Sequence, residues 1–378
     1  VRTTTLLLED GGRLATTVGS SGANGGNLSI EATRSIEVNN STIAADVGSM
    51  DSPVEAGHGG NIEIQTEQLK IKDNGRISTS LNGESTGNSG QISIDAEDIR
   101  LTASQSARTG IFSQVDEGGE GNAGHINIVT NILRLTNDET QINASNLRTG
   151  AAGDITIEAS RWIHISDGAS IVSKVRNNLE ASRPAEIDIT ADRLSLVNRG
   201  SIDSSLSDGV GRTGNINITA NTVEFDGGPE GLPTKIQSLI EQFSVGRGIA
   251  GNIQLNGVDN LTIRNGGFIS TVVLGDGQSG EIEINARFIE ISGVGGTSNN
   301  PFSRISTRIA EEGEASQAGD LAIVAEELIL RDGGRIIADS SGAGAGGTIT
   351  VEADRIFMIE AASLSDVSQE VNEFNVSS

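Results

Sequence analysis

Residues 60–80 read GNIEIQTEQLKIKDNGRISTS, and this stretch decides the fold. Three short segments within it alternate apolar with polar residues: Ile62 to Ile64, Leu69 to Ile71 and Ile77 to Ser80. Alternation with a period of two predicts strands and not helices. Gly60 and the run Asp73-Asn-Gly75 supply turn residues between the segments. One copy of the stretch therefore predicts three strands and three turns.

Eleven copies of this pattern follow one another along the 378 residues. The spacing between copies ranges from 28 to 39 residues, so the minimum is nearly constant while the excess varies. Such spacing is typical of a solenoid whose loops carry insertions. Leu6, Leu8 and Leu14 supply the second and third strands of one more copy, so we expect the array to be in progress at the first residue. The first strands of the eleven copies begin at Leu28, Ile62, Ile92, Ile126, Ile155, Ile187, Ile216, Ile253, Ile282, Leu321 and Ile349.

Each copy offers too few inward apolar side chains to form a core alone, so the copies must stack with equivalent strands paired in parallel. Connections between parallel strands are right-handed by strong preference. We therefore expect one all-β domain over residues 1–378, a right-handed parallel β-helix with about 30 residues and three strands per coil and roughly twelve coils. At about 4.8 Å per coil the rod would be on the order of 55 Å long. A β-propeller, the alternative, needs four strands in about 40 residues per blade.

Composition limits the partners. Lys and Arg number 26 against 51 Asp and Glu, a net charge of −25, which repels nucleic acid and anionic lipid. The absence of cysteine excludes disulfides, thiolate metal sites and thiol catalysis. No apolar run approaches the roughly 18 residues that span a bilayer, so no membrane insertion is expected.

Three segments depart from the repeat. Loop insertions are expected near residues 226–250 and 292–304, and a polar C-terminal tail over 365–378. Within the first insertion, the spacing of apolar residues from Pro233 to Phe243 predicts a short amphipathic helix. Insertions on one face of a solenoid often carry binding, and a lid over exposed core is the alternative.

A polar residue opens the first strand of every copy. Stacked amide side chains can hydrogen-bond along such a corner of the coil, so the column is interpreted as a structural ladder and not as a ligand stripe. The amides of the ladder are Asn27, Asn61, Asn215 and Asn252, and the other copies have Gln91, His125, Asp154, Glu186, Glu281, Asp320 and Thr348.

Four consecutive copies place a basic residue at the outward position of the second strand: Lys70, Arg100, Arg134 and His164. Trp162, the only tryptophan, is expected to point from the same face. Because like charges on neighbouring strands repel, something should compensate them. An anionic glycan is one candidate, and neutralisation by the nearby acids Glu67, Glu97 and Asp98 is the other.

The sequence predicts no catalytic residue, no cofactor and no metal site. Of the three histidines, His58 and His125 lie in or beside Gly-rich turns, and no base, nucleophile and acid converge. Glu186 and Asp188 alternate on one strand and point to solvent, where nothing would raise the pKa of either carboxyl. Acidic turns such as Asp332-Gly-Gly334 do not match the Gly-Gly-x-Gly-x-Asp calcium repeat.

The repeat as a whole, Gly-Asn-Ile-x-Ile-x-Ala, then Leu-x-Leu-x-Asp-Gly-Gly, then Ile-Ser-Ala/Thr-Ser, resembles the filamentous-haemagglutinin-like exoproteins of two-partner secretion systems, especially their cyanobacterial versions. The resemblance covers essentially the whole chain. It implies a β-helical shaft, secreted or displayed on the cell surface and exported through an outer-membrane secretion pore. The family's N-terminal secretion domain, with Asn-Pro-Asn type motifs, has no counterpart here, and Asn300-Pro301 is a loop dipeptide. The clearest copies are Gly60 to Ser80, Gly214 to Asp226, Gly251 to Thr271 and Gly319 to Asp339.

Together these observations predict a non-enzymatic extracellular or cell-surface shaft with a structural or adhesive role. Its expected partners are surface glycans or matrix and other copies of the chain, stacked end to end into filaments. Two alternatives remain open: a carbohydrate-active β-helical enzyme, either a polysaccharide lyase or a hydrolase, and a passive stalk that presents an effector encoded elsewhere in a longer chain.

Overall fold

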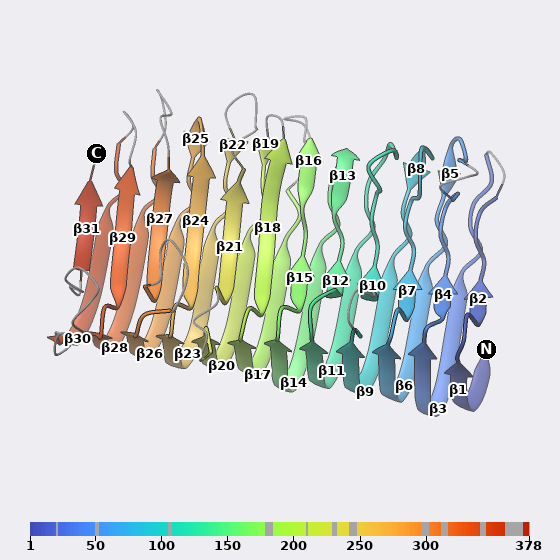
Figure 1. The fold of residues 1–378 in the computed structure, drawn as a ribbon, viewed down its shortest axis with the longest axis horizontal. Coiled ribbons are helices and arrows are strands. Elements are labelled where there is room, and N and C mark those ends of the chain that lie inside the picture. Colours follow the sequence, from blue (N-terminus) through green and yellow to red (C-terminus); the bar gives the residue numbers. More distant parts are fainter. Residues whose placement is uncertain are drawn as a thin grey trace.

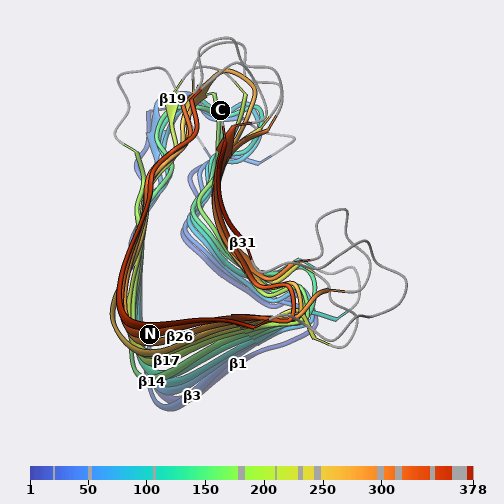
Figure 2. The ribbon, with the colours of Figure 1, turned by 90° about the vertical axis from the view of Figure 1, so that its left-hand side faces the viewer.

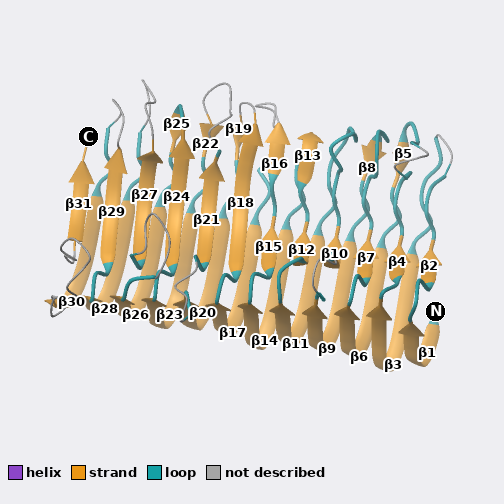
Figure 3. Cartoon of the chain, in the orientation of Figure 1, coloured by secondary structure: helices purple, strands orange, loops and turns teal. Residues whose placement is uncertain are grey.

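The computed structural model is an all-β parallel β-solenoid with about ten turns of about 31 residues each, and it contains no helix in the residues it describes (Figure 3). The described residues are 1–19, 22–49, 53–104, 108–177, 184–208, 211–228, 233–241, 248–295, 302–310, 317–340, 345–359 and 373–377.

One long strand per coil builds a twelve-stranded parallel sheet, here called sheet A. Every one of the eleven predicted starts is the first residue of such a strand. The strands are β1 (Arg2–Leu8), β3 (Leu28–Asn39), β6 (Ile62–Lys72), β9 (Ile92–Thr102), β11 (Ile126–Thr136), β14 (Ile155–Ser166), β17 (Ile187–Val197), β20 (Ile216–Asp226), β23 (Ile253–Arg264), β26 (Ile282–Ser292), β28 (Leu321–Arg331) and β30 (Ile349–Ile359).

The first and second strands predicted for each copy are two halves of this one strand. The strand bends at its middle, so sheet A forms two sides of the cross-section (Figure 2). The pairing register shifts at the bend, for example between Ala32 and Ser35 of β3. The bend lets the apolar residues of both halves face the same interior.

The third predicted strand of each copy belongs to a second parallel sheet, sheet B, which closes the coil. Its outer face is concave in cross-section (Figure 2). Its strands are β2 (Arg13–Ala15), β4 (Thr42–Ala44), β7 (Arg76–Ser78), β10 (Thr109–Phe112), β12 (Thr140–Asn143), β15 (Ser170–Val172), β18 (Ser201–Asp208), β21 (Lys235–Ile240), β24 (Phe268–Leu274), β27 (Arg304–Ala310), β29 (Arg335–Ser340) and β31 (Glu373–Ser377), with β13 (Asn146–Thr149) and β16 (Val175–Asn177) beside them.

Short strands line the side between sheet B and the start of the next long strand. They form a two-stranded and a three-stranded parallel sheet. The first contains β5 (Gly57–His58) and β8 (Gly87–Asn88), and the second contains β19 (Gly211–Arg212), β22 (Gly248–Ile249) and β25 (Gly277–Gln278).

The coil is right-handed, as expected. Seen from its C-terminal end, the chain descends along one side of sheet A, crosses the base and rises along sheet B while it advances towards the viewer (Figures 1 and 2). The estimate of roughly twelve coils was too high, because β1 and β30 belong to incomplete coils and about ten full turns lie between them.

The core is a set of stacked aliphatic columns. Ile62, Ile92, Ile126 and Ile155 pair residue for residue across four successive strands, and each exposes at most 1% of its surface. The columns merge into one buried cluster that runs along sheets A and B. Within each half of a long strand, alternation separates inside from outside, because neighbouring residues point to opposite faces, and the alternation shifts at the bend, as between Thr66 and Leu69 of β6.

Glycine occupies the tightest corner of the coil. A Cβ atom on Gly90 would collide with the carbonyl oxygen of Gly60 in the coil before it, and Gly124 stands in the same relation to Gly90. Only glycine lets the two backbones approach this closely. This contact explains why glycine comes directly before the polar residue in every copy except the one that has Ala185.

The helix predicted from Pro233 to Phe243 is wrong. Residues Lys235–Ile240 form β21, which pairs with β18 and β24. Ile236 and Ile240 are both buried, because residues four apart also share one face of a strand. Pairing with the coils on either side outweighs the helical spacing, and Phe243 lies outside the described residues.

The structure describes parts of the two expected insertions and of the expected C-terminal tail. Residues 229–232, 242–247 and 296–301, within the two expected insertions, lie outside the described part of the chain. The expected polar tail over 365–378 contains a strand, since the backbone of Glu373–Ser377 pairs with β29.

Candidate functional site

The polar residues at the corner form a ladder from side chain to backbone. Asn27 Oδ1 accepts the backbone N–H of Asn61 at 3.0 Å, and Asn61 Oδ1 accepts that of Gln91 at 2.9 Å. Asn215 does the same for Asn252, and Asn252 for Glu281, both at 2.9 Å. The expected hydrogen bonds between stacked amide side chains are not what holds this ladder; each amide oxygen instead accepts a backbone N–H of the next coil.

Non-amide residues occupy the same place in the ladder. His125 Nδ1 accepts the backbone N–H of Asp154 at 3.0 Å, and Asp154 Oδ1 accepts that of Glu186 at 2.8 Å. These side-chain acceptors are engaged in holding the corner.

The four basic residues, here called the basic row, lie side by side on the outer face of sheet A after the bend. Lys70, Arg100, Arg134 and His164 are direct partners on β6, β9, β11 and β14. Trp162 lies on the same face two residues before His164, in the column that also contains Asp98.

Asp98 neutralises much of the basic row. Its carboxylate lies 2.7 Å from Arg100 Nη2 and 3.3 Å from Arg134 Nη1. Of the three acids considered from the sequence, Asp98 is the one that forms these pairs, because it follows the bend and faces the same side as the row. In the described part of the chain, Lys70 has no ion-pair partner.

The aromatic end of the row is packed. The Arg134 guanidinium lies 5.2 Å from the centroid of the Trp162 ring, and the Trp162 and His164 rings are 4.9 Å apart. Burial lowers the pKa of His164, and the positive charges of Arg134 and Arg193 act in the same direction. His164 is therefore neutral at pH 7 and adds ring surface to the row, not charge.

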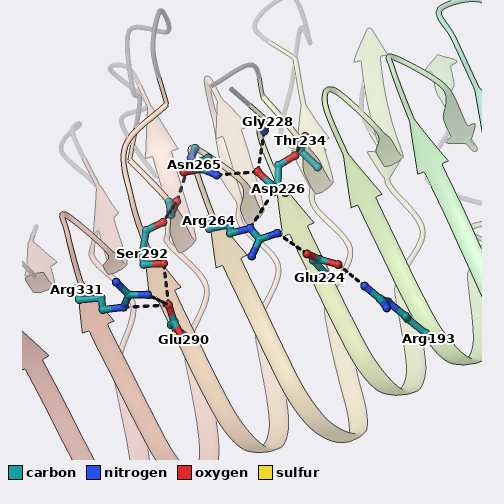
Figure 4. Close-up of polar contacts among 12 residues, drawn as sticks. Arg193, Glu224, Asp226, Gly228, Thr234, Arg264, Asn265, Glu290, Ser292 and Arg331 are labelled. Carbon is teal, nitrogen blue, oxygen red and sulfur yellow. Dashed lines mark hydrogen bonds and ion pairs between the residues drawn. The ribbon is translucent and has the colours of Figure 1, made fainter. Parts of the chain in front are cut away.

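Beyond the basic row, the same face carries side chains of both charges, which form ion pairs with one another (Figure 4). Glu224 accepts hydrogen bonds from Arg193 and from Arg264, each at 2.7 Å. Arg264 also reaches Asp226 at 2.8 Å, and Arg331 binds Glu290 on later coils.

Within this group of ion pairs, Asp226 accepts hydrogen bonds from three residues. Although burial opposes its ionisation, hydrogen bonds from Asn265, the Gly228 backbone and Arg264 hold the pKa of Asp226 below its usual value. The C-terminal half of the face is thus internally compensated and offers no single sign of charge to a partner.

A cavity on the concave outer face of sheet B was missed from the sequence. It encloses about 380 Å³ near the N-terminal end of the rod. Arg13, Asp46, Arg76, Arg108 and Asp116 are among its charged lining residues. One signal pointed to it, because Arg13 and Arg76 each come directly before the first apolar residue of a third strand and so recur on one outer column.

Two carboxyl groups of this cavity are perturbed. Burial raises the pKa of Asp46, while hydrogen bonds from Ser78 and from the Ser80 backbone oppose the rise. Burial also raises the pKa of Asp116, against the attraction of Arg108. Perturbed carboxyls in a cavity are a feature of ligand and active sites.

The remaining groups with chemical potential do not converge. His58 lies on β5, His125 at the corner and His164 on sheet A. Asp188 accepts a hydrogen bond from Asn217 Nδ2 at 2.7 Å. Among the described residues, no cluster of three or more His, Asp or Glu could hold a metal ion, and no helix is long and apolar enough to cross a membrane.

No protein-family model matches the chain, and no curated protein or solved structure matches it either. The β-solenoid fold therefore stands on the structure itself.

Proposed function

We propose that the protein is a non-enzymatic structural and adhesive shaft that is secreted or displayed at the cell surface. The observation that supports this most is the uninterrupted parallel pairing from β1 to β30 around a main buried cluster that runs along sheets A and B. Such a stack repeats each outward position about every 4.8 Å along the rod. A repeating surface suits many weak contacts with a polymer, whose combined affinity can far exceed that of one contact.

The resemblance of the repeat to two-partner secretion exoproteins supports the extracellular location and export through an outer-membrane pore. Anionic glycans or matrix are the proposed partners, and the basic row is the proposed contact. Lys70 forms no ion pair with a described acid, since the neighbouring Glu37 pairs with Lys72, while Arg100 and Arg134 share Asp98. The contact should therefore be weak for one shaft and sensitive to salt.

Retention on an immobilised anionic polysaccharide, eluted with rising salt, tests this contact. Replacing Lys70, Arg100 and Arg134 by Ser should move elution to markedly lower salt. A control that removes three exposed arginines elsewhere, Arg2, Arg34 and Arg161, changes net charge equally and should elute close to the unchanged protein. Equal elution of the two triple variants would remove the basic row as the contact.

A glycan-cleaving enzyme is the second candidate, and one observation favours it. Asp46 and Asp116 line the same cavity, and burial raises the pKa of both carboxyls, as a general acid requires. We expect no cleavage when acidic and neutral glycans are assayed for new reducing ends or unsaturated products. If the protein cleaved a glycan and Asp46→Asn or Asp116→Asn abolished the cleavage, the protein would be an enzyme and the proposed non-enzymatic function would be wrong.

A further inference from the structure

The cavity on sheet B gathers positive charge in a strongly acidic protein. Arg13, Arg76 and Arg108 line it together, while the chain has a net charge of −25. Within the described ranges, no carboxylate forms an ion pair with any of these three guanidinium groups. Burial lowers the pKa of Arg108, and the charge of Arg76 adds to this effect. The cavity therefore holds cations whose charge is not neutralised by direct contact.

The guanidinium groups are held in place by neutral contacts. Arg108 Nη2 donates to Gln114 Oε1 at 2.8 Å, and Arg76 Nε donates to the Arg108 carbonyl at 3.2 Å. Phe112 lies beneath both, with its ring centroid 4.8 Å from the Arg108 guanidinium carbon and 5.9 Å from that of Arg76. Two planar donors are thus pre-positioned on one aromatic support, an arrangement that suits recognition of a carboxylate.

Gln114 independently indicates that the cavity accepts a ligand. The residue lines the cavity and exposes only 3% of its surface. Its Nε2 is shielded and donates to no acceptor among the described residues. Buried amide donors are normally satisfied, so an acceptor brought by a ligand would complete the site.

The cavity also contains acceptors. The Asp46 carboxylate accepts hydrogen bonds from Ser78 Oγ at 2.6 Å and from the Ser80 backbone at 2.8 Å, and Asp116 lies on the same wall. Carboxylates repel an inorganic dianion such as phosphate, whereas they bind the hydroxyl groups of a sugar. A ligand with both a carboxylate and hydroxyl groups fits this lining best.

We propose that this cavity binds one acidic sugar unit, a uronate, with its carboxylate on Arg76 and Arg108 and its hydroxyl groups towards Asp46 and Asp116. A cavity of about 380 Å³ lies at the small end of ligand sites, which suits one or two sugar rings. The site is distinct from the basic row and does not depend on adhesion through it.

Titration calorimetry of the full chain with trigalacturonate tests the proposal, with maltotriose and inorganic phosphate as comparison ligands. Trigalacturonate should bind, and Arg76→Gln and Arg108→Gln should each weaken binding at least tenfold. Arg34→Gln makes the same charge change on sheet A and should leave the affinity unaltered. Thermal denaturation of each variant shows that it is folded, and Arg76→Gln serves if Arg108→Gln is not.

Three results would overturn the proposal: no binding of trigalacturonate, equal affinity in all variants, or phosphate binding as tight as that of the trisaccharide. The variant that lacks Lys70, Arg100 and Arg134 should still bind trigalacturonate, even where it no longer stays on a polysaccharide column. Failure of this site and failure of the basic row are therefore separate outcomes.

Discussion

Ile126 lies in the middle of an aliphatic column, between Ile92 and Ile155, and exposes none of its surface. Ile126→Asp would bury a carboxylate without a partner and should lower the free energy of unfolding by roughly 4 kcal/mol or more. Ser93, one position after Ile92, points outward, so Ser93→Asp should change it by less than about 0.5 kcal/mol. Chemical denaturation measures both, and equal effects would mean that the two faces are assigned wrongly.

Asp46 should make stability depend on pH. Because burial raises its pKa above 3.8, the unfolded chain ionises first as pH rises, and the folded state loses stability through this window. Asp46→Asn keeps an oxygen acceptor for Ser78 and Ser80 and removes the charge.

The expected result is a higher Tm than that of the unchanged protein at pH 7, with the difference shrinking towards pH 3. Exposed Glu63→Gln is the control and should show no such trend. A lower Tm for Asp46→Asn at pH 7 would mean that the ionised carboxylate stabilises the fold.

At the level of single residues, alternation was enough to predict which side chains are inside. It placed Lys70, Arg100 and Arg134 on one outer row, and the pairing confirms that placement. The choice of Asp98 over Glu97 as their partner could not be predicted, because it depends on where the strand bends. The neutral state of His164 depends on burial, which a linear pattern does not contain.

The corner glycines set how closely two coils can stack. Gly90→Ala should lower the free energy of unfolding by about 3 kcal/mol, since its Cβ would meet the Gly60 carbonyl and neither backbone can move freely. Gly26→Ala is a matched control in the same column, because its nearest atom, Thr16 Cβ, is 3.5 Å away. Thermal unfolding compares the stability of the two variants. An equal loss of stability would show that the close approach of the coils is not what makes Gly90→Ala destabilising.

The ion pairs on sheet A should contribute more to the free energy of unfolding where their side chains are more buried. Glu224 is joined to two arginines, and its side chain is 17% exposed, so Glu224→Gln should cost about 1 kcal/mol at low salt and less at high salt. The exposed pair of Arg2 with Glu31 is the control, and Glu31→Gln should cost less than about 0.5 kcal/mol. Chemical denaturation at two salt concentrations measures both losses of stability, and an equal loss for Glu224→Gln and Glu31→Gln would contradict a role for burial.

At the level of elements, strand existence was predictable and strand continuity was not. The two apolar pairs of each copy predict separate strands, whereas each long strand bends without a break, and the bend lacks glycine and proline in every copy except β23, where Gly257 lies at the register shift. For residues Lys235–Ile240 the sequence predicts a helix where the structure has a strand, since four-residue spacing fits a helix as well as one face of a strand. The sheet B cavity was missed because its arginines are 32 or more residues apart in the chain.

Among the described strands, β1 and β30 are the two terminal strands of sheet A, and each pairs with one neighbour. On β30, Ile356 and Met358 continue core columns and are 45% and 48% exposed, while Leu7 on β1 and Phe357 on β30 are exposed at outward positions. Open strand edges are templates for another chain. We expect this chain to self-associate end to end as concentration rises, and more strongly at high salt, where its negative charge is screened.

Light scattering after chromatography measures this association. Leu7→Lys combined with Phe357→Lys should reduce it, because lysine on an edge strand opposes pairing. Val129 and Val324 are equally exposed on the flanks of the rod, and replacing both by Lys should leave the association unchanged. A strictly monomeric parent chain at high concentration would mean that the ends already cap themselves.

Because sheet A is paired continuously from β1 to β30, the length of the rod is set by the number of coils. Removing the 29 residues from Gly124 to Ala152 would bring Gly153 into the place of Gly124 and leave every column continuous. Recombination between copies can therefore lengthen or shorten the rod by one step of about 4.8 Å without inventing a new core. In evolutionary terms, duplication or deletion of whole repeats can therefore adjust the length of the rod.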